Sequence, residues 1–336
     1  MRTPTFGVLT TLLYLTTACG DDSAPDAPGS GGSGATGGGS GGTAAAASGG
    51  SGGSGAGSSG GTGGSTPASG GSGASGGSSS GCEGEFGPAE TILEATGFYI
   101  ASPSVTGDQL ELFYVEEVIG VRQSTVKVLR RESGAEPFGA AETVQELSVC
   151  AAYEGQTLDV SGDGLRMYFT CHADELATAP LRRAVRPDRS SPFVIDPEPL
   201  GSVGVSIDLS SDELTALSAT DGAGAAPRMY TRASATEGFG AGQAIPGIDV
   251  GLINPELSGD GLSLLGALPG DDYFYHLAIA RRSAITEPFS GLTGEGLPTP
   301  PAAISYASPA LSTDCRSLYF VRIDASGNFT LHVAKR

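Results

Sequence analysis

One short pattern recurs five times between Val105 and Tyr319, and this internal repeat constrains the fold more than any other feature of the chain. Each copy has an apolar residue, a Ser or Thr, any residue and an Asp, and an apolar pair follows the Asp by four and five positions. The repeat Asp residues, separated by 55, 49, 48 and 54 positions, are Asp108, Asp163, Asp212, Asp260 and Asp314. Such self-similarity indicates a fold assembled from copies of one small unit.

A second pattern accompanies every copy in constant phase. An Arg stands 20 to 23 positions after each repeat Asp, and a Phe stands seven positions after each of the first four Arg residues. The Arg residues are Arg131, Arg186, Arg232, Arg282 and Arg336, and the Phe residues are Phe138, Phe193, Phe239 and Phe289. Two patterns in register over five copies indicate a structural repeat.

A period near 50 residues with short apolar runs and turn signals is typical of β-propeller blades, and no helical periodicity competes with it. The Ser-x-Asp segment predicts a tight turn between two strands, because Ser and Asp side chains accept backbone N–H groups. Residues 82–336 are numerous enough for one large core. We therefore expect an all-β fold, a single propeller of five four-stranded blades.

The ends of the repeat array predict how the ring closes. The last copy stops at Arg336, so the fifth blade has only three strands of its own. The segment Phe86–Ile92 matches Phe138–Val144, which begins the fourth strand after the first copy. We therefore expect the N-terminal segment to supply the fourth strand of the last blade, which would otherwise present an open edge.

The hairpin that begins at Ser161, with the pattern Ser-x-Asp-Gly-x-x-x-Tyr-Phe, resembles the WD40-like, TolB-type PD40 propeller repeat. The resemblance covers about residues 86–336. It implies a propeller that acts as an interaction module in the envelope of Gram-negative bacteria. The chain has five repeats instead of six and lacks the N-terminal α/β domain of TolB, so the resemblance does not imply a role in the Tol system.

Residues 1–18 have the parts of a secretory signal peptide. Arg2 is a short basic region, and an apolar run over Phe6–Tyr14 is followed by small residues that lead to Cys19. The apolar run is too short to span a bilayer as a helix.

The residues around Cys19 resemble a bacterial lipobox, in which the cysteine receives a diacylglyceryl group before cleavage. Thr16 stands where that family prefers Leu. We expect lipidation of Cys19, with ordinary signal-peptidase cleavage after Ala18 as the alternative. In the resembling family, Gly20 directly after the cysteine implies sorting to the outer membrane of a Gram-negative bacterium, so we expect a lipid-anchored protein of the cell envelope.

Residues 19–81 consist mainly of Gly, Ser, Ala, Thr and Pro and predict a disordered tether, because such a segment has no apolar side chains that could offset chain entropy. A Gly-rich coil of this length spans roughly 40–50 Å. The tether can therefore hold a folded domain away from the membrane. No other segment has 18 continuous apolar residues, so the expected membrane contact is the lipid anchor alone.

The formal net charge of −19 makes nucleic acid an unsuitable partner, because an acidic protein repels phosphate backbones.

The four remaining cysteines predict two disulfides, since an even number in an exported chain is typical of bridged domains. In a four-stranded antiparallel blade, Cys150 before a first strand and Cys171 at the end of a second strand lie on one face of the disc. Cys315, in the turn between a first and a second strand, lies on the opposite face, where the segment of Cys82 also begins. We therefore predict the pairs Cys150–Cys171 and Cys82–Cys315.

The sequence contains no motif for a nucleophile elbow, a zinc protease, a phosphate-binding loop or a dinucleotide fold. We interpret His172, His276 and His332 as strand residues of the blades. We therefore expect no catalytic residue, no cofactor and no resident metal.

Three carboxylates, Asp159, Asp208 and Glu256, stand four positions before the repeat Asp in consecutive copies, where they could ring the central channel. Five-bladed glycosidases use inner carboxylates as acid, base and pKa modulator, and acidic oxygens also suit Ca²⁺. The simplest interpretation is that these side chains hydrogen-bond strand ends or face channel water. The chain has no Trp for sugar stacking, although the aromatic run 273–275 could substitute.

These features favour a non-enzymatic envelope lipoprotein that presents its propeller for binding an unknown envelope protein or surface ligand. We expect it to be a monomer. The alternative is a surface glycan-binding or glycoside-hydrolysing propeller that uses the channel carboxylates. Fold alone does not decide between these functions.

Overall fold

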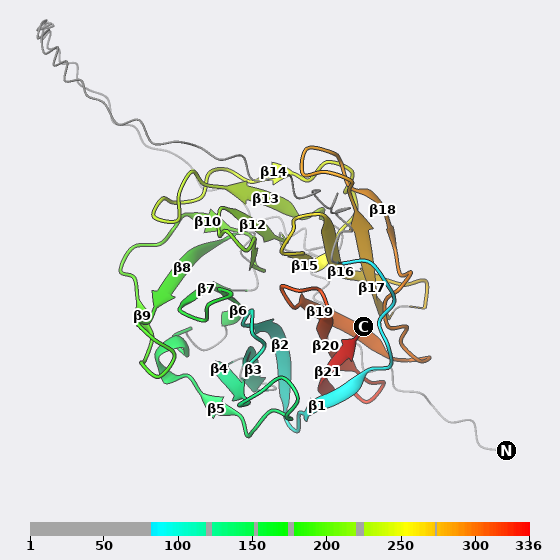
Figure 1. The fold of residues 1–336 in the computed structure, drawn as a ribbon, viewed down its shortest axis with the longest axis horizontal. Coiled ribbons are helices and arrows are strands. Elements are labelled where there is room, and N and C mark those ends of the chain that lie inside the picture. The colour runs from blue at the N-terminus through cyan, green and yellow to red at the C-terminus, as the bar shows by residue number, and fades with distance from the viewer. Residues whose placement is uncertain (1–81, 119–122, 151–153, 174–177, 220–224, 273) are drawn as a thin grey trace, which may run out of the picture. The chain divides into compact units, whose positions relative to one another are not determined.

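A computed structural model describes residues 82–336, except 119–122, 151–153, 174–177, 220–224 and 273. These residues form five antiparallel sheets arranged as blades around a central axis (Figure 1), which confirms the predicted all-β, five-bladed propeller. The predicted signal peptide, the lipidation of Cys19 and the tether lie outside the described residues. Ser78–Arg336 is one compact unit that contains every described core residue, so we expect this propeller segment to fold on its own.

Each blade runs outward from an inner strand that lines the axis. Blade 1 consists of β2 (Phe98–Val105), β3 (Glu111–Val118), β4 (Ser124–Arg130) and β5 (Glu142–Thr143). Blade 2 consists of β6 (Glu154–Val160), β7 (Arg166–Ala173), β8 (Ala179–Val185), β9 (Val194–Ile195) and β10 (Ser202–Val203). Blade 3 consists of β11 (Asp208–Leu209), β12 (Thr215–Ser218), β13 (Arg228–Thr231) and β14 (Gln243–Ala244).

Blade 4 consists of β15 (Ile253–Leu257), β16 (Ser263–Pro269), β17 (Tyr275–Arg281) and β18 (Ser290–Thr293). Blade 5 consists of β19 (Ser305–Leu311), β20 (Ser317–Ile323), β21 (Phe329–Lys335) and the N-terminal strand β1 (Glu90–Glu94). Blade 2 departs from the four-stranded expectation, because two short strands, β9 and β10, both pair with β8 at its outer edge. A 3₁₀ turn, Gln145–Leu147, connects blades 1 and 2.

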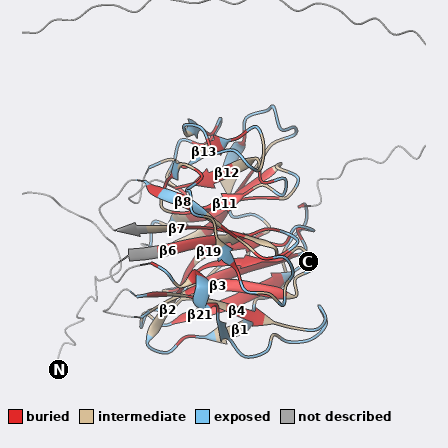
Figure 2. Ribbon diagram, turned by 90° about the vertical axis from the view of Figure 1, so that its left-hand side faces the viewer, coloured by how far each residue is buried: buried red, intermediate tan, exposed pale blue. Residues whose placement is uncertain are grey.

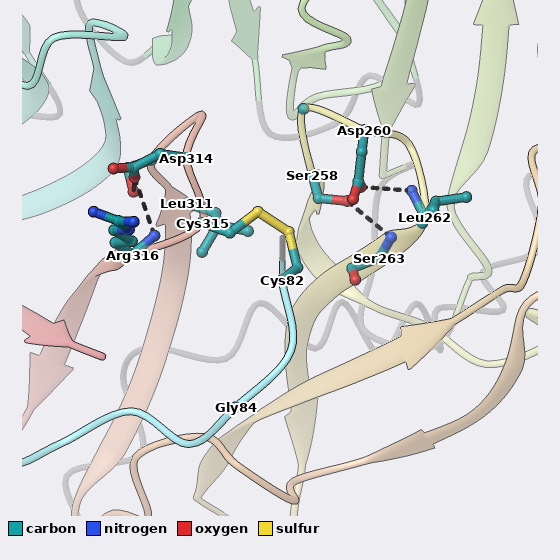
Figure 3. The surroundings of a disulfide bond; sticks show 12 residues. Cys82, Gly84, Ser258, Asp260, Leu262, Ser263, Leu311, Asp314, Cys315 and Arg316 are labelled. Atoms are coloured by element: carbon teal, nitrogen blue, oxygen red, sulfur yellow. Dashed lines mark hydrogen bonds between the residues drawn. A yellow bond between two sulfur atoms is a disulfide. The ribbon is translucent and has the colours of Figure 1, made fainter. Parts of the chain in front are cut away.

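The Ser-x-Asp pattern forms the turn between the first and second strands of every blade. In each turn the Ser or Thr hydroxyl donates to the repeat Asp at 2.6–2.7 Å. The same Asp oxygen accepts the backbone N–H two residues later at 2.9–3.1 Å. Figure 3 shows two such turns, at Asp260 and Asp314. The repeat Asp residues are therefore turn residues, each with one carboxylate oxygen engaged by its own turn.

The Arg and Phe of the second pattern contact each other in all five blades. Each Arg Nε donates to a backbone carbonyl of its own Ser-x-Asp turn at 2.7–2.8 Å. Each guanidinium also lies over the ring of the partner Phe, 4.4–4.5 Å from its centroid. Such cation–π contacts stabilise by about 0.5–2 kcal/mol each. One Arg thus connects the third strand, the turn and the start of the fourth strand of its blade.

The ring closes as the sequence predicts. Strand β1 pairs antiparallel with β21, with Glu90 opposite Val333. Arg336 lies 4.4 Å from the centroid of the Phe86 ring, so the N-terminal segment supplies the Phe that the last copy lacks. Arg336 Nη1 also donates to the carbonyl of Cys82 at 2.9 Å.

Two disulfides join the residues that the blade geometry pairs. Cys82 bonds Cys315 at the ring closure (Figure 3), and Cys150 bonds Cys171 on blade 2, with Cα–Cα distances of 5.0 and 5.3 Å. Disulfides are typical of proteins that fold in oxidising compartments, so they indicate an extracytoplasmic domain. Within the part of the chain that the structure describes, no helix is long and apolar enough to cross a membrane.

The core lies between the blades and follows the strands (Figure 2). Successive residues of a strand point to opposite faces, so an aromatic pair on a middle strand packs against both neighbouring blades. On β3, Phe113 packs with Met167 of blade 2, and Tyr114 packs with Leu331 of blade 5. The equivalent pairs on β7 and β20 are Tyr168-Phe169 and Tyr319-Phe320, all fully buried. The second residue of the repeat's apolar pair and the residue that follows it therefore join neighbouring blades.

Candidate functional site

The three carboxylates predicted to ring the channel do lie together at the axis. They stand on the inner strands of blades 2, 3 and 4, and Ser104 and Ala310 occupy the equivalent positions of blades 1 and 5. All five positions line one cavity of about 580 Å³. We call these five residues the inner ring: Ser104, Asp159, Asp208, Glu256 and Ala310.

The inner ring connects each blade to the next by hydrogen bonds. Ser104 Oγ accepts the backbone N–H of Val160 at 2.9 Å and donates to Asp159 Oδ1 at 2.7 Å. The three carboxylates each accept a backbone N–H from the following blade: Asp159 from Leu209, Asp208 from Leu257 and Glu256 from Leu311, at 2.7–2.9 Å. Ala310 has no acceptor, so the series is open between blades 5 and 1. Hydrogen bonding to strand ends, the simplest sequence interpretation, is what the geometry shows.

The cavity is open at the face of the Ser-x-Asp turns and narrow at the other end. Turn residues form its rim, namely Gly107, Gly162, Ser211, Gly259 and Thr313. Beyond the inner ring, the remaining space is a cavity of about 20 Å³ lined by Pro103, Leu158, Ile207, Pro255 and Pro309. Among the described residues, the wide part of the channel is therefore the part beside the Ser-x-Asp turns.

Irregular inner strands produce this narrow end. The residues before three of the prolines have positive φ angles of 45–48°, and they are Ser102, Asn254 and Ser308. The register of β2, β15 and β19 shifts at these same places. Proline cannot donate to a ladder and is found in sheets mainly at edges and bulges. The Ser-Pro and Asn-Pro sequences thus bend the inner strands toward the axis.

The cavity is strongly acidic. Besides the three ring carboxylates it is lined by Glu213 and Asp314, and among its described lining residues there is no Lys, Arg or His. Tyr168 is the one aromatic residue among them. The electrostatic field of such a cavity repels anions and favours cationic groups.

Burial of the ring carboxyl groups raises their pKa values. Burial is the main cause for all three: it raises the pKa of Asp159 to about 6, that of Glu256 to about 8, and that of Asp208 well above its ordinary value. Repulsion from the other ring carboxylates raises the pKa values of Asp208 and Glu256 further. Asp208 and Glu256 also hydrogen-bond each other, which requires a proton between them.

Glu213 forms a charged wall of the cavity that sequence reasoning missed. Arg166 Nε donates to it at 2.7 Å, and the Tyr168 hydroxyl donates to it from blade 2. Arg232 Nη2 donates to the Tyr168 hydroxyl at 3.0 Å, so both cations of this cluster are already engaged.

A sequence signal for Glu213 did exist. The residue after each repeat Asp has a positive φ of 58–74°, which suits Gly, and Gly164 and Gly261 occupy it in blades 2 and 4. The other three copies have Gln109, Glu213 and Cys315 there, and each makes a specific bond. Tyr319 donates to Gln109 at 3.1 Å, Tyr168 donates to Glu213, and Cys315 forms a disulfide. A residue other than Gly at this left-handed position therefore indicates that its side chain makes a specific contact.

The other residues considered from the sequence lie elsewhere. His276, the second residue of β17, bonds Asp272 at 3.0 Å, and burial lowers the pKa of His332 on β21 to about 4. The side chain of His172, like Tyr273, lies outside the described residues. Among described residues, no group of three or more His, Cys, Asp or Glu side chains has the arrangement to hold a metal ion.

Together, the blades and the pocket define a five-bladed β-propeller with an acidic central cavity. The sequence matches no known protein family, and no curated protein is similar to it in sequence. Several solved structures share the fold.

An α-L-arabinofuranosidase from Podospora anserina, solved with cellotriose, aligns with a TM-score of 0.52 and 10% identity over 75% of this chain and 97% of that enzyme. The catalytic domain of a Coprinopsis cinerea GH62 α-L-arabinofuranosidase aligns equally well, with a TM-score of 0.52, 10% identity, and 75% and 96% coverage. TolB from Acinetobacter baumannii aligns with a TM-score of 0.42 and 15% identity over 74% of this chain. The chain spans 57% of the length of TolB. At these identities the likeness shows the fold alone.

Proposed function

We propose that this chain is a non-enzymatic binding protein of the cell envelope that takes a cationic group of its ligand into the central cavity. The observation that carries the proposal is a central cavity of about 580 Å³ whose charged lining groups are all acidic among the residues described. The net charge of −19 would steer a cationic partner toward it. A Lys or Arg side chain of an envelope protein, or an amino group of a surface ligand, has the required chemistry.

The arrangement of the ring carboxylates supports binding in preference to glycoside hydrolysis. Hydrolysis uses two carboxyl groups about 5–5.5 Å apart in retaining enzymes or about 6.5–9.5 Å apart in inverting enzymes. Asp208 and Glu256 are in direct hydrogen-bond contact, which is closer than either spacing. Each of the three carboxylates is also engaged by a backbone N–H of the next blade.

Titration of the propeller segment with small probes tests the binding proposal. Arginine amide is the cationic probe and citrulline amide is its neutral isostere, and both are followed by the ¹⁵N–¹H shifts of Val160, Leu209 and Leu257. At pH 7.5 we expect saturable shifts with arginine amide only, and an affinity at least about tenfold lower in Asp159→Asn, which corresponds to the loss of one charge contact because the Asp159 carboxyl group, with a pKa of about 6, is ionised at that pH. Equal responses to the two probes, or no response at millimolar concentration, would contradict the proposal.

The location is part of the same proposal. Two disulfides indicate an oxidising compartment. We propose that Cys19 carries a lipid and that the Gly/Ser-rich segment links it to the propeller, on the resemblance of the N-terminus to a lipobox.

A second candidate function, glycan hydrolysis, is favoured by one observation. Glu256 lines the open cavity with a pKa of about 8, and a general acid needs a carboxyl group that stays protonated near neutral pH. Incubation of the propeller segment with a panel of polysaccharides tests it. Release of reducing sugar that Asp208→Asn abolishes would replace the non-enzymatic proposal.

A further inference from the structure

We propose that Asp159, Asp208 and Glu256 form a proton-sharing latch that holds blades 2 to 5 around the cavity and loosens when the shared protons are lost. The latch would regulate the cavity in which ligand binding is proposed. It needs no ligand for its action, so its test is independent of that function.

The first argument is geometric. Every hydrogen bond of the latch crosses from one blade to the next, and the donors are backbone N–H groups of inner strands: Leu209, Leu257 and Leu311. Blade 3 depends on it most, because its inner strand β11 has only two residues paired with β12. Asp208 lies on this strand and accepts from blade 4, while Leu209 donates to Asp159 of blade 2.

The second argument concerns the interface that lacks a latch bond. Ala310 leaves the inner ring open between blades 5 and 1, and this is where the ring is closed by other means. Strand β1 pairs with β21 in blade 5 and continues directly into β2 of blade 1. The Cys82–Cys315 disulfide fixes the same segment. Closure by strand and disulfide therefore complements closure by the latch.

The third argument concerns charge. The Asp208–Glu256 hydrogen bond exists only while one of the two groups is protonated. Around them, Glu213 and Asp314 add negative charge to the cavity, and the nearest described cations, Arg166 and Arg232, are engaged by Glu213 and Tyr168. Loss of the proton would leave two buried carboxylates in contact without a counter-ion, an arrangement that is strongly repulsive.

The fourth argument identifies the pH range in which the latch acts. Because burial raises the pKa of Glu256 to about 8 and that of Asp208 well above its ordinary value, the Asp208–Glu256 pair keeps its proton at neutral pH and loses it in the alkaline range, whereas Asp159, with a pKa of about 6, is already mostly ionised at neutral pH. His332, which stacks on Phe320 of the same blade, has a pKa lowered to about 4 by burial, so it affects stability only below about pH 6.5.

Three of the turn carboxyl groups have lowered pKa values. Hydrogen bonds in the turns hold the pKa values of Asp108, Asp163 and Asp212 below their ordinary range against the opposing effect of burial. Experiments between pH 6.5 and 9 therefore isolate the latch from these groups and from His332.

Hydrogen exchange of the propeller segment, read residue by residue by NMR, tests the proposal. Between pH 6.5 and 9 we expect the protection factors of the Leu209, Leu257 and Leu311 amides to fall by at least about tenfold, which is the change that corresponds to one pKa unit. The amide of Arg131, which bonds the Leu110 carbonyl in a turn, serves as the internal reference and should keep its protection.

One variant and one control complete the test. Glu256→Gln is a neutral isostere that retains the acceptor for Leu311 N–H and donates to Asp208, so it should abolish the fall in protection. Glu237→Gln, an exposed carboxylate on blade 3, should leave the fall unchanged.

If the Glu256→Gln variant fails to fold, a measurement on the wild-type chain alone still tests the latch. The ¹³C shifts of the Asp208 and Glu256 carboxyl groups should titrate above pH 6.5. Titration of both groups near pH 4, or unchanged protection of the three latch amides at pH 9, would overturn the latch.

Discussion

Removal of the disulfide that closes the ring should destabilise the propeller more than removal of the disulfide within blade 2. Cys82 and Cys315 are 233 positions apart, whereas Cys150 and Cys171 are 21 apart. In the chain-entropy model, the longer loop is worth about 5 kcal/mol and the shorter one about 3 kcal/mol. Ala at both positions of each pair is the matched perturbation, since it leaves no free thiol. Two pairs in one chain therefore provide an internal comparison.

The backbone conformation at Cys315 allows a second comparison, between Ala and Gly at that position. Its φ of 58° lies in the left-handed region, where two other blades have Gly. Cys82→Ala with Cys315→Gly should therefore recover about 1 kcal/mol relative to Cys82→Ala with Cys315→Ala, because Gly has no Cβ penalty there.

Urea denaturation of the propeller segment at neutral pH measures these differences through the free energy of unfolding. The wild type, the Cys82/Cys315 pair and the Cys150/Cys171 pair are compared under one condition. A smaller loss for the Cys82/Cys315 pair than for the Cys150/Cys171 pair would refute the view that the N-terminal strand closes the ring under entropic constraint. No gain from Gly over Ala at position 315 would refute the strain argument.

Four further predictions follow from the same structure. Deletion of Glu85–Leu93 exposes the edge of β21 and should lower the melting temperature and the monomer fraction in size-exclusion chromatography; an unchanged monomer would argue against closure by β1. Ala310→Ser supplies the missing ring acceptor for the N–H of Val105 and should raise the free energy of unfolding by about 1 kcal/mol; a loss in urea unfolding would show that the site has no room for the hydroxyl. The pKa of Glu256 is raised from 4.5 to about 8, so its contribution to stability is complete below about pH 4.5 and is lost as pH rises through 8. At pH 9, Glu256→Gln should therefore be more stable than wild type by a few kcal/mol, on the order of the pKa shift multiplied by about 1.4 kcal/mol per pKa unit. Equal stability of the two proteins at pH 9 would exclude this linkage. Cys19→Ser should abolish acyl labelling and release the protein from the membrane fraction, and a variant that still pellets with membranes would exclude the lipid anchor.

The sequence by itself determined the unit of the fold and its closure. The Ser-x-Asp turn and the Arg with its Phe act within one blade or at its edge, so each copy repeats the same contacts at the same spacing. The match between Phe86–Ile92 and Phe138–Val144 could be found without coordinates for the same reason, because the N-terminal strand occupies a repeat position. The extra strand β10 could not be predicted, since two residues are too few to show a pattern.

The tertiary structure alone decided how the inner carboxylates behave. Their equivalent positions could be predicted from the repeat, but their hydrogen bonds reach the N–H groups of a different blade, about 50 residues away in sequence. The contact between Asp208 and Glu256, the distance of cations and the depth of burial depend on how tightly five twisted sheets pack around one axis. Burial and mutual repulsion raise the pKa values of these groups, and both arise only when separate blades bring like charges together at the axis.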